Sequence, residues 1–191
     1  MLRRFAFGCS RCLVIEFMGR TRAQLGTLPA GDQGTQATLS LMRKLVDGPN
    51  GAMNLVVREA AINLVRQVGD IEHNALGQLQ AIYYFVRDRI MFVGDVAGVE
   101  TLQSPRYTLH VKAGDCDDRA TLMAALARAI GIPAELSFRV VAANPSAPRA
   151  FSHVFVMARI NGRNYALDPT YHSNPFDYQY PAVTRREDFA L

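Results

Sequence analysis

The sequence predicts an α+β domain in which helices come first and an antiparallel sheet follows. Apolar residues recur at helical spacing between residues 35 and 130, whereas the final third of the chain contains three strand-like runs. Hydrophobic residues make up 49% and charged residues 20% of the 191 residues, which is typical of one globular domain. Helices followed by strands favour a sheet packed on a helix.

Four helices are expected. Three amphipathic patterns cover about 35–46, 52–68 and 71–90, after a turn-rich connector at 26–34. An irregular segment at 91–113 follows, in which Met91-Phe92-Val93 is extended. The fourth helix runs from about Cys116 to Ile130, and the Gly131-Ile132-Pro133 sequence ends it.

Three strands are expected after the fourth helix, at Glu135–Ala142, Phe151–Ile160 and Arg163–Leu167. The last two are joined by Asn161-Gly162, the strongest short signal for a hairpin. The predicted organisation has a poorly ordered leader and connector at 1–33 and one domain at 34–191. Within that domain we expect a helical part at 34–90, a catalytic core at 91–172 and a C-terminal tail at 173–191.

The formal charge of +4 is confined to one end of the chain. Residues 1–22 contain five arginines and one glutamate, whereas residues 23–191 contain 16 basic and 16 acidic residues. No nucleic-acid partner is therefore expected for the body of the protein, and DNA binding through the terminal arginines is the weaker alternative. A start at Met18 would remove Arg3, Arg4, Arg11 and Glu16 and would lower the formal charge from +4 to +2.

Neither a membrane span nor a secretion signal is predicted. No run reaches the roughly 18–20 apolar residues that a span needs. The charged start at Met1-Leu2-Arg3-Arg4 resembles a signal peptide, but Arg11 and Glu16 interrupt the segment that follows.

No metal site, cofactor or disulfide framework is predicted. The chain has three cysteines, and the Cys9-x-x-Cys12 pair lacks the second pair of ligands that zinc needs. The acidic cluster of Asp115, Asp117 and Asp118 could suggest a cation site, but helix capping explains it more simply.

Cys116 is the candidate nucleophile. It begins a helix, where unpaired backbone N–H groups and the helix dipole favour a thiolate. The neighbouring carboxylates oppose ionisation, so a cationic partner is needed, for which histidine is the natural choice.

His153 is the candidate base and Asp168 the candidate orienting group. Alternation places His153 with Phe151, Phe155 and Met157 on one face of an apolar strand. Asp168 ends the strand that the hairpin returns beside it, where a carboxylate can orient an imidazole. Each of the three residues alone has an ordinary structural explanation.

Other residues near these motifs are alternatives for roles in the site. His110 and His172 are alternative bases, although both are expected in loops or at the surface. The aromatic residues near the C-terminus could line a substrate cleft, although they more often dock a tail on the core: Phe176, Tyr178 and Tyr180.

Three motifs in this order resemble the transglutaminase-like superfamily. They are a Cys-initiated helix ending in Ile-Gly-Ile-Pro at 113–134, a histidine strand at 152–156 and an aspartate motif at 165–170. The resemblance covers about residues 70–172. It implies a papain-like core with Cys116 as nucleophile, His153 as base and Asp168 as orienting residue of a catalytic triad.

The resemblance also implies acyl transfer through a thioester, as in a cysteine protease, amidase or acyltransferase. Two oxyanion donors are wanted, for which we expect the backbone N–H of Cys116 and the side chain of Gln103. Gln103 is equally consistent with a turn residue that bonds to backbone. The chain has no tryptophan and lacks the extra β-domains and evident calcium loops of calcium-dependent relatives, so hydrolysis is favoured over cross-linking.

The segment at 98–105 resembles transglutaminase-like proteins of bacteriophages and prophages more loosely. That link implies a peptide or protein substrate, such as a peptidoglycan peptide or a virion protein, and a cytoplasmic or virion-associated location. The alternative function is a non-catalytic scaffold or assembly protein of a phage or prophage that retains the fold.

Overall fold

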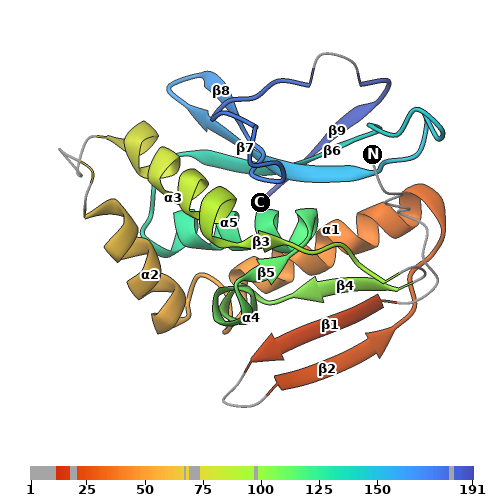
Figure 1. Ribbon diagram of the computed structural model, residues 1–191, viewed down its shortest axis with the longest axis horizontal. Coiled ribbons are helices and arrows are strands. Elements are labelled where there is room, and N and C mark those ends of the chain that lie inside the picture. The colour runs from red at the N-terminus through yellow and green to blue at the C-terminus, as the bar shows by residue number, and fades with distance from the viewer. Residues whose placement is uncertain (1–11, 18–20, 67, 69–73, 97–98, 181–182) are drawn as a thin grey trace.

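The computed structural model shows an α+β architecture with a central helix between two sheets (Figure 1). It describes residues 12–17, 21–66, 68, 74–96, 99–180 and 183–191. The helices are α1 (Gly31–Asp47), α2 (Leu55–Val65), α3 (Ala75–Arg89), α4 (Pro105–Val111) and α5 (Cys116–Ala129). The strands are β1 (Cys12–Phe17), β2 (Thr21–Gly26), β3 (Met91–Phe92), β4 (Glu100–Gln103), β5 (Ala113–Gly114), β6 (Glu135–Val141), β7 (His153–Ile160), β8 (Arg163–Leu167) and β9 (Arg186–Ala190).

Helix α5 is the centre of the molecule. It packs against α1, α2, α3, α4 and β7, and nearly all of its residues are buried. Small residues such as Ala120, Ala124 and Ala125 let these neighbours approach closely, and alanine is also the best helix former. The helix ends in a Schellman arrangement, in which Gly131 has a φ of +67° and the Ile132 N–H bonds to the Ala127 carbonyl.

The sheet that carries the predicted histidine has four antiparallel strands in the order β8-β7-β6-β9. One face of β7 contributes Val154 and Val156 to the main core against α5. The other contributes Phe155 and Met157 to a smaller cluster. The predicted alternation is therefore confirmed from His153 onward, but Phe151 precedes the strand and joins the main core instead.

The Asn161-Gly162 turn connects β7 and β8 as predicted. Both residues have positive φ angles, 50° and 80°, which is the conformation that a two-residue type I′ turn requires. The register pairs Ile160 with Arg163 and Val156 with Leu167. Asp168 therefore emerges one residue after the paired region, on the strand beside the one that begins with His153.

The second sheet has three strands in the order β2-β1-β4, and the sequence analysis did not predict it. Residues 12–17 pair with both β2 and β4, and Cys12 is buried in the core. The expectation that residues 1–33 form a poorly ordered leader is therefore wrong for β1 and β2. Cys9 and the terminal arginines up to Arg11 lie outside the described residues.

Short elements complete the fold. Strands β3 and β5 form a parallel pair that places Phe92 beside Gly114, just before α5 begins. Helix α4 and strand β9 were also not predicted; β9 adds the fourth strand to the histidine sheet. Among the described residues, no helix is long and apolar enough to cross a membrane.

Candidate active site

Cys116 is the first residue of α5, and its position is held by reciprocal capping. Asp115 is the N-cap residue, and its carboxylate accepts from the Asp118 N–H at 3.5 Å. The Asp118 carboxylate accepts from the Asp115 N–H at 3.3 Å and from the Gln103 N–H at 2.7 Å. This capping box ties the start of α5 to the end of β4, so that the nucleophile candidate sits at a well-supported helix terminus.

His153 and Asp168 are in direct contact. The Nε2 atom of His153 lies 2.8 Å from Oδ2 of Asp168. The exposed fractions are 6% for His153 and 0% for Asp168, so the hydrogen bond is shielded from water. An ionised carboxylate can only accept, so Nε2 carries a proton, and whenever the ring is neutral Nδ1 is its unprotonated nitrogen.

Asp168 receives further hydrogen bonds. The Thr170 N–H donates to Oδ1 at 3.1 Å, and the Tyr180 hydroxyl donates to Oδ2 at 2.6 Å. Burial by itself raises the pKa of Asp168, but the His153 charge and the bonds from His153, Tyr180 and Thr170 outweigh burial and lower it to about 2. Asp168 is therefore a carboxylate at neutral pH.

The sulfur of Cys116 meets the same strand that carries His153. The backbone N–H of Val154, the residue after His153, hydrogen-bonds to it, and the Asp168 charge acts on it. Burial raises the pKa of the Cys116 thiol well above its usual value, and the Asp115 charge raises it further, whereas the Val154 hydrogen bond lowers it. The thiol is thus protonated in the resting protein.

The three carboxylates around Cys116 form the group of described residues that could hold a metal ion. One oxygen from each of Asp115, Asp117 and Asp118 lies within 4.8 Å of the others, and all three side chains are buried. Burial raises the pKa of Asp117 and of Asp118 well above the usual range. The capping bonds already account for the positions of Asp115 and Asp118, as the sequence analysis expected.

Gln103 lies on β4, but its side chain makes a different contact from the predicted one. Its Oε1 accepts a long, 3.4 Å hydrogen bond from the Thr108 hydroxyl. Gln103 also borders a hollow of about 230 Å³ whose described lining includes Asp95 and Asp118 but not Cys116. Its role as an oxyanion donor stays a prediction.

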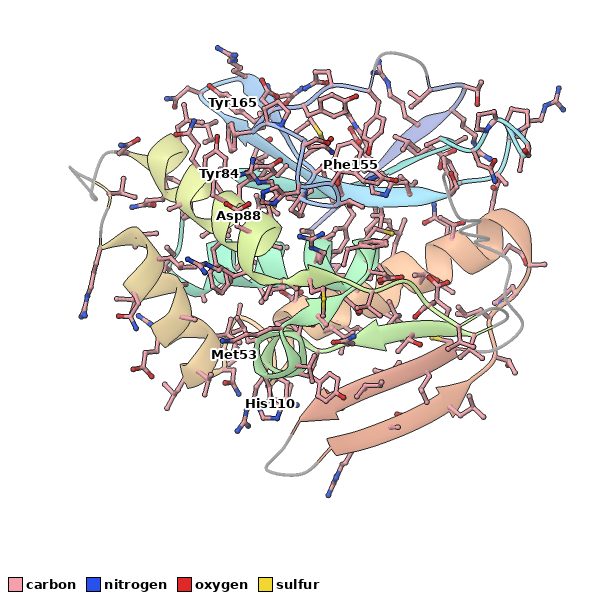
Figure 2. The ribbon with its side chains drawn as sticks, in the orientation of Figure 1. Met53, Tyr84, Asp88, His110, Phe155 and Tyr165 are labelled. Carbon is pink, nitrogen blue, oxygen red and sulfur yellow. The ribbon has the colours of Figure 1, made fainter. Side chains whose placement is uncertain are left out.

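The two alternative histidines lie away from the His153–Asp168 pair. The ring of Phe155 is 5.8 Å from that of His153, and Figure 2 shows His110 on α4 at the opposite end of the molecule from Phe155. His172 is largely exposed and forms an ion pair with Asp88 at 3.3 Å.

Sequence reasoning missed two residues that stabilise Asp168 and the turn that follows it. Tyr180 was considered only as a cleft-lining or tail-docking residue, and Arg119 was not considered. The Arg119 guanidinium is buried and donates to the carbonyls of Thr170, Val86 and Arg87. Arg119 directly follows Asp117 and Asp118 in the polar first turn of α5, so the local sequence gave no signal that its side chain is buried.

A family model described as the transglutaminase-like superfamily matches residues 62–169, more than half of the chain. The chain belongs to the transglutaminase-like superfamily. The match begins within α2 and ends just after Asp168, so it contains Cys116, His153 and Asp168. The predicted family and fold class are confirmed.

Solved structures show relatives of this fold in larger proteins. A candidate protease from Parabacteroides distasonis aligns with a TM-score of 0.53 at 17% identity, covering 81% of this chain and 29% of that one. A candidate cysteine protease from Cytophaga hutchinsonii aligns with a TM-score of 0.44 at 20% identity, covering 60% of this chain and 36% of that one. This superfamily member therefore matches about a third of each of those proteins. No curated protein matches it significantly.

Proposed function

We propose that this transglutaminase-like protein is a cysteine hydrolase that cleaves a peptide or amide bond through a thioester on Cys116. The observation that carries the proposal is the buried 2.8 Å contact between His153 Nε2 and Asp168 Oδ2. This contact leaves His153 Nδ1 free to exchange a proton. The same strand brings the Val154 N–H to the Cys116 sulfur, so nucleophile and base candidates belong to one neighbourhood.

The proposed reaction needs no group beyond these residues and water. His153 takes the thiol proton as the Cys116 sulfur attacks the carbonyl carbon, and the C–N bond then breaks as His153 returns the proton to the leaving amine. A water molecule gives a proton to His153 and adds to the thioester, which releases the acid and restores the thiol. An amine in place of water would give acyl transfer.

Asp168 has an electrostatic role in this scheme. When His153 accepts the thiol proton it becomes an imidazolium, and the adjacent carboxylate stabilises that charge. The carboxyls near the sulfur oppose thiolate formation only in their charged forms, and burial, which raises the pKa of Asp117 and of Asp118, disfavours those forms. His153 is thus the group that must drive ionisation of Cys116.

The start of α5 supplies the first proposed oxyanion donor, the backbone N–H of Cys116. Gln103 remains the predicted second donor through its Nε2 amide, because the contact with Thr108 uses the Oε1 atom. A Gln103→Ala variant whose acylation rate stays within a few-fold of wild type would remove it from the scheme.

The test is the reactivity of Cys116 toward iodoacetamide at pH 6–7, followed by peptide mass spectrometry. We expect alkylation at least about tenfold faster in wild type than in the His153→Ala variant, because His153 must take the thiol proton as the sulfur attacks. Cys12 is equally buried and has no histidine strand beside it, so it serves as the internal control. Labelling of Cys116 as slow as that of Cys12 would contradict the proposal and favour the scaffold alternative.

A further inference from the structure

Oδ2 of Asp168 has two close donors from different parts of the chain, in addition to a longer, 3.4 Å contact with the Asn174 amide. Oδ2 lies 2.8 Å from Nε2 of His153 and 2.6 Å from the hydroxyl of Tyr180, which also lies within the part of the chain that follows the family match. The carboxylate orientation that suits His153 is therefore also set by a phenol from the C-terminal tail. The shorter of the two bonds is the one to Tyr180.

The Tyr180 ring also contacts the imidazole. The ring centroids of Tyr180 and His153 are 5.6 Å apart with an interplanar angle of 63°, an edge-to-face arrangement. Phe155 lies 5.9 Å from Tyr180 and 5.8 Å from His153, so the three rings pack together. This packing limits rotation of the imidazole and covers the His153–Asp168 hydrogen bond.

The segment that carries Tyr180 is anchored independently of it. Asp177 accepts a hydrogen bond from the Ala166 N–H at 2.9 Å, next to the end of β8. The Asn174 amide lies 3.4 Å from Asp168 Oδ2 and from its carbonyl oxygen. Removing the Tyr180 hydroxyl alone should therefore leave the tail in place.

The hydroxyl of Tyr180 acts as a donor at every relevant pH. Burial, the Asp168 charge and the hydrogen bond to it raise the pKa of Tyr180 far above its ordinary value, so the phenol keeps its proton. The same bond is among those that lower the pKa of Asp168 to about 2, against the opposing effect of burial.

We propose that Tyr180 is a positioning residue for the His153–Asp168 pair: its hydroxyl orients the carboxylate and its ring holds the imidazole. This inference rests on the proposed function, because it concerns how Asp168 supports His153 as the base. A tail-anchoring residue alone would fill space against Phe155 without affecting proton exchange at Cys116.

The test compares Tyr180→Phe with Tyr178→Phe, in the full-length chain. Tyr178 is a matched control because it lies two residues away on the same segment, with its ring 5.2 Å from that of Tyr180. The probe is iodoacetamide, and the readout is the rate of Cys116 alkylation as a function of pH. Urea unfolding establishes that both variants are folded under the assay conditions.

In Tyr180→Phe, we expect the acid limb of the pH–rate profile for Cys116 alkylation to shift upward by about one pH unit. We also expect the plateau rate of alkylation to fall several-fold. The reason is that Asp168 stays charged but loses a competing donor, so it holds the imidazolium proton to higher pH and shifts the acid limb, whereas the carboxylate and the ring lose the contact that orients them and the plateau falls. Tyr178→Phe should match wild type. Equal profiles for wild type and Tyr180→Phe, or equal changes in both variants, would overturn the inference.

A second measurement does not depend on thiol chemistry. In the proton NMR spectrum, the Nε2–H resonance of His153 should move downfield in Tyr180→Phe, because Asp168 becomes a stronger acceptor when its other donor is removed. It should stay in place in Tyr178→Phe. If wild-type Cys116 shows no His153-dependent reactivity, the proposed function fails, and an unchanged resonance in Tyr180→Phe is what would separately refute the role of Tyr180.

Discussion

Arg119 links the candidate site to the helical part of the molecule. Its Nη1 donates to the Thr170 carbonyl at 3.0 Å, just after Asp168, and its Nη2 donates to the carbonyls of Val86 and Arg87 at the end of α3. Burial lowers the pKa of Arg119 to about 10, and the opposing charge of Asp168 limits the change. The guanidinium remains charged and acts as a brace between α3 and the Asp168 turn.

Replacing this brace by lysine should destabilise the protein. A single ammonium cannot reach the three carbonyls that the planar guanidinium serves, so Arg119→Lys leaves buried acceptors unpaired. We expect a loss of about 2–4 kcal/mol in the free energy of unfolding, measured by urea denaturation.

The matched control for that experiment is Arg128→Lys on the same helix. Arg128 is partly exposed and pairs with Asp47, so its replacement should change the free energy of unfolding by less than about 0.5 kcal/mol. An Arg119→Lys variant as stable as Arg128→Lys would show that the buried guanidinium does not stabilise the contact between α3 and the turn after Asp168.

At the residue scale, the sequence pointed to the three candidate site residues but not to the side chains that support them. Cys116, His153 and Asp168 each follow a local pattern, a helix start or a strand end, that can be recognised without knowing the fold. Tyr180 supports Asp168 across a chain reversal, and nothing in the local sequence around it specifies which carboxylate its hydroxyl meets. The structure brings His153 and Asp168 into contact and places Cys116 beside Val154.

At the element scale, the start of α5 is surrounded by carboxyls that titrate near neutrality. Burial is the main cause that raises the pKa of Asp95 to about 6 and that of Glu100 to about 7, and Asp115 adds to both. Asp95 and Glu100 lie before and at the start of β4, so the carboxyls converge from separate segments on the helix terminus. Their charged forms repel one another in the folded state.

This convergence predicts that stability falls as pH rises. In the unfolded chain Asp and Glu titrate near 3.9 and 4.3, so between about pH 4 and pH 7 the folded protein binds more protons than the unfolded one. The free energy of unfolding should therefore decrease between pH 5 and pH 8. We expect Glu100 alone to contribute on the order of 1–2 kcal/mol of this decrease, after allowing for its partial exposure.

The measurement is urea denaturation of wild type and Glu100→Gln at pH 5, 6.5 and 8. Glu100→Gln should flatten the pH dependence, because the amide does not ionise. Glu59→Gln, on the exposed side of α2, should keep the wild-type slope. A wild-type stability that rises from pH 5 to pH 8 would contradict the raised pKa values.

Elements with a long periodic pattern were predictable, whereas of the short paired strands outside the β7–β8 hairpin only β3 was expected, as the extended piece at Met91-Phe92-Val93. The hairpin between β7 and β8 and the helix α5 follow from local signals that agree with the final packing. Strand β4 has only four residues, and its partner β1 lies almost 90 residues earlier in the chain. Pairing over that distance depends on how the helices between them fold, so no local signal at 100–103 reveals it.

At the scale of the whole molecule, the two ends of the described chain both complete sheets. Strand β1 joins β2 to β4, and β9 closes the sheet that carries His153 (Figure 1). The division into a leader, a core and a tail therefore understates how much the terminal segments contribute to the two sheets. Between the β9 strand and the main domain lies Tyr180, so the tail has separable roles in stability and in the site.

Shortening the chain to end at Arg185 tests that separation. The truncation removes β9, including Phe189, which packs against the core and is paired with Phe138 of β6. It retains Tyr180 and the ion pair between Arg185 and Asp32. We expect a loss of about 2–4 kcal/mol in the free energy of unfolding by urea denaturation, because one partly buried aromatic side chain and one strand pairing are lost.

The folded fraction of that truncated chain should keep the wild-type pH profile of Cys116 alkylation, because every contact of Asp168 remains. Tyr180→Phe should give the opposite pattern, with an altered profile and little change in the urea midpoint. The two variants together distinguish a tail that only stabilises the sheet from one that also positions the base. A truncated chain that loses both stability and the Cys116 profile while still folded would show that β9 itself, through β6 and β7, holds His153 in place.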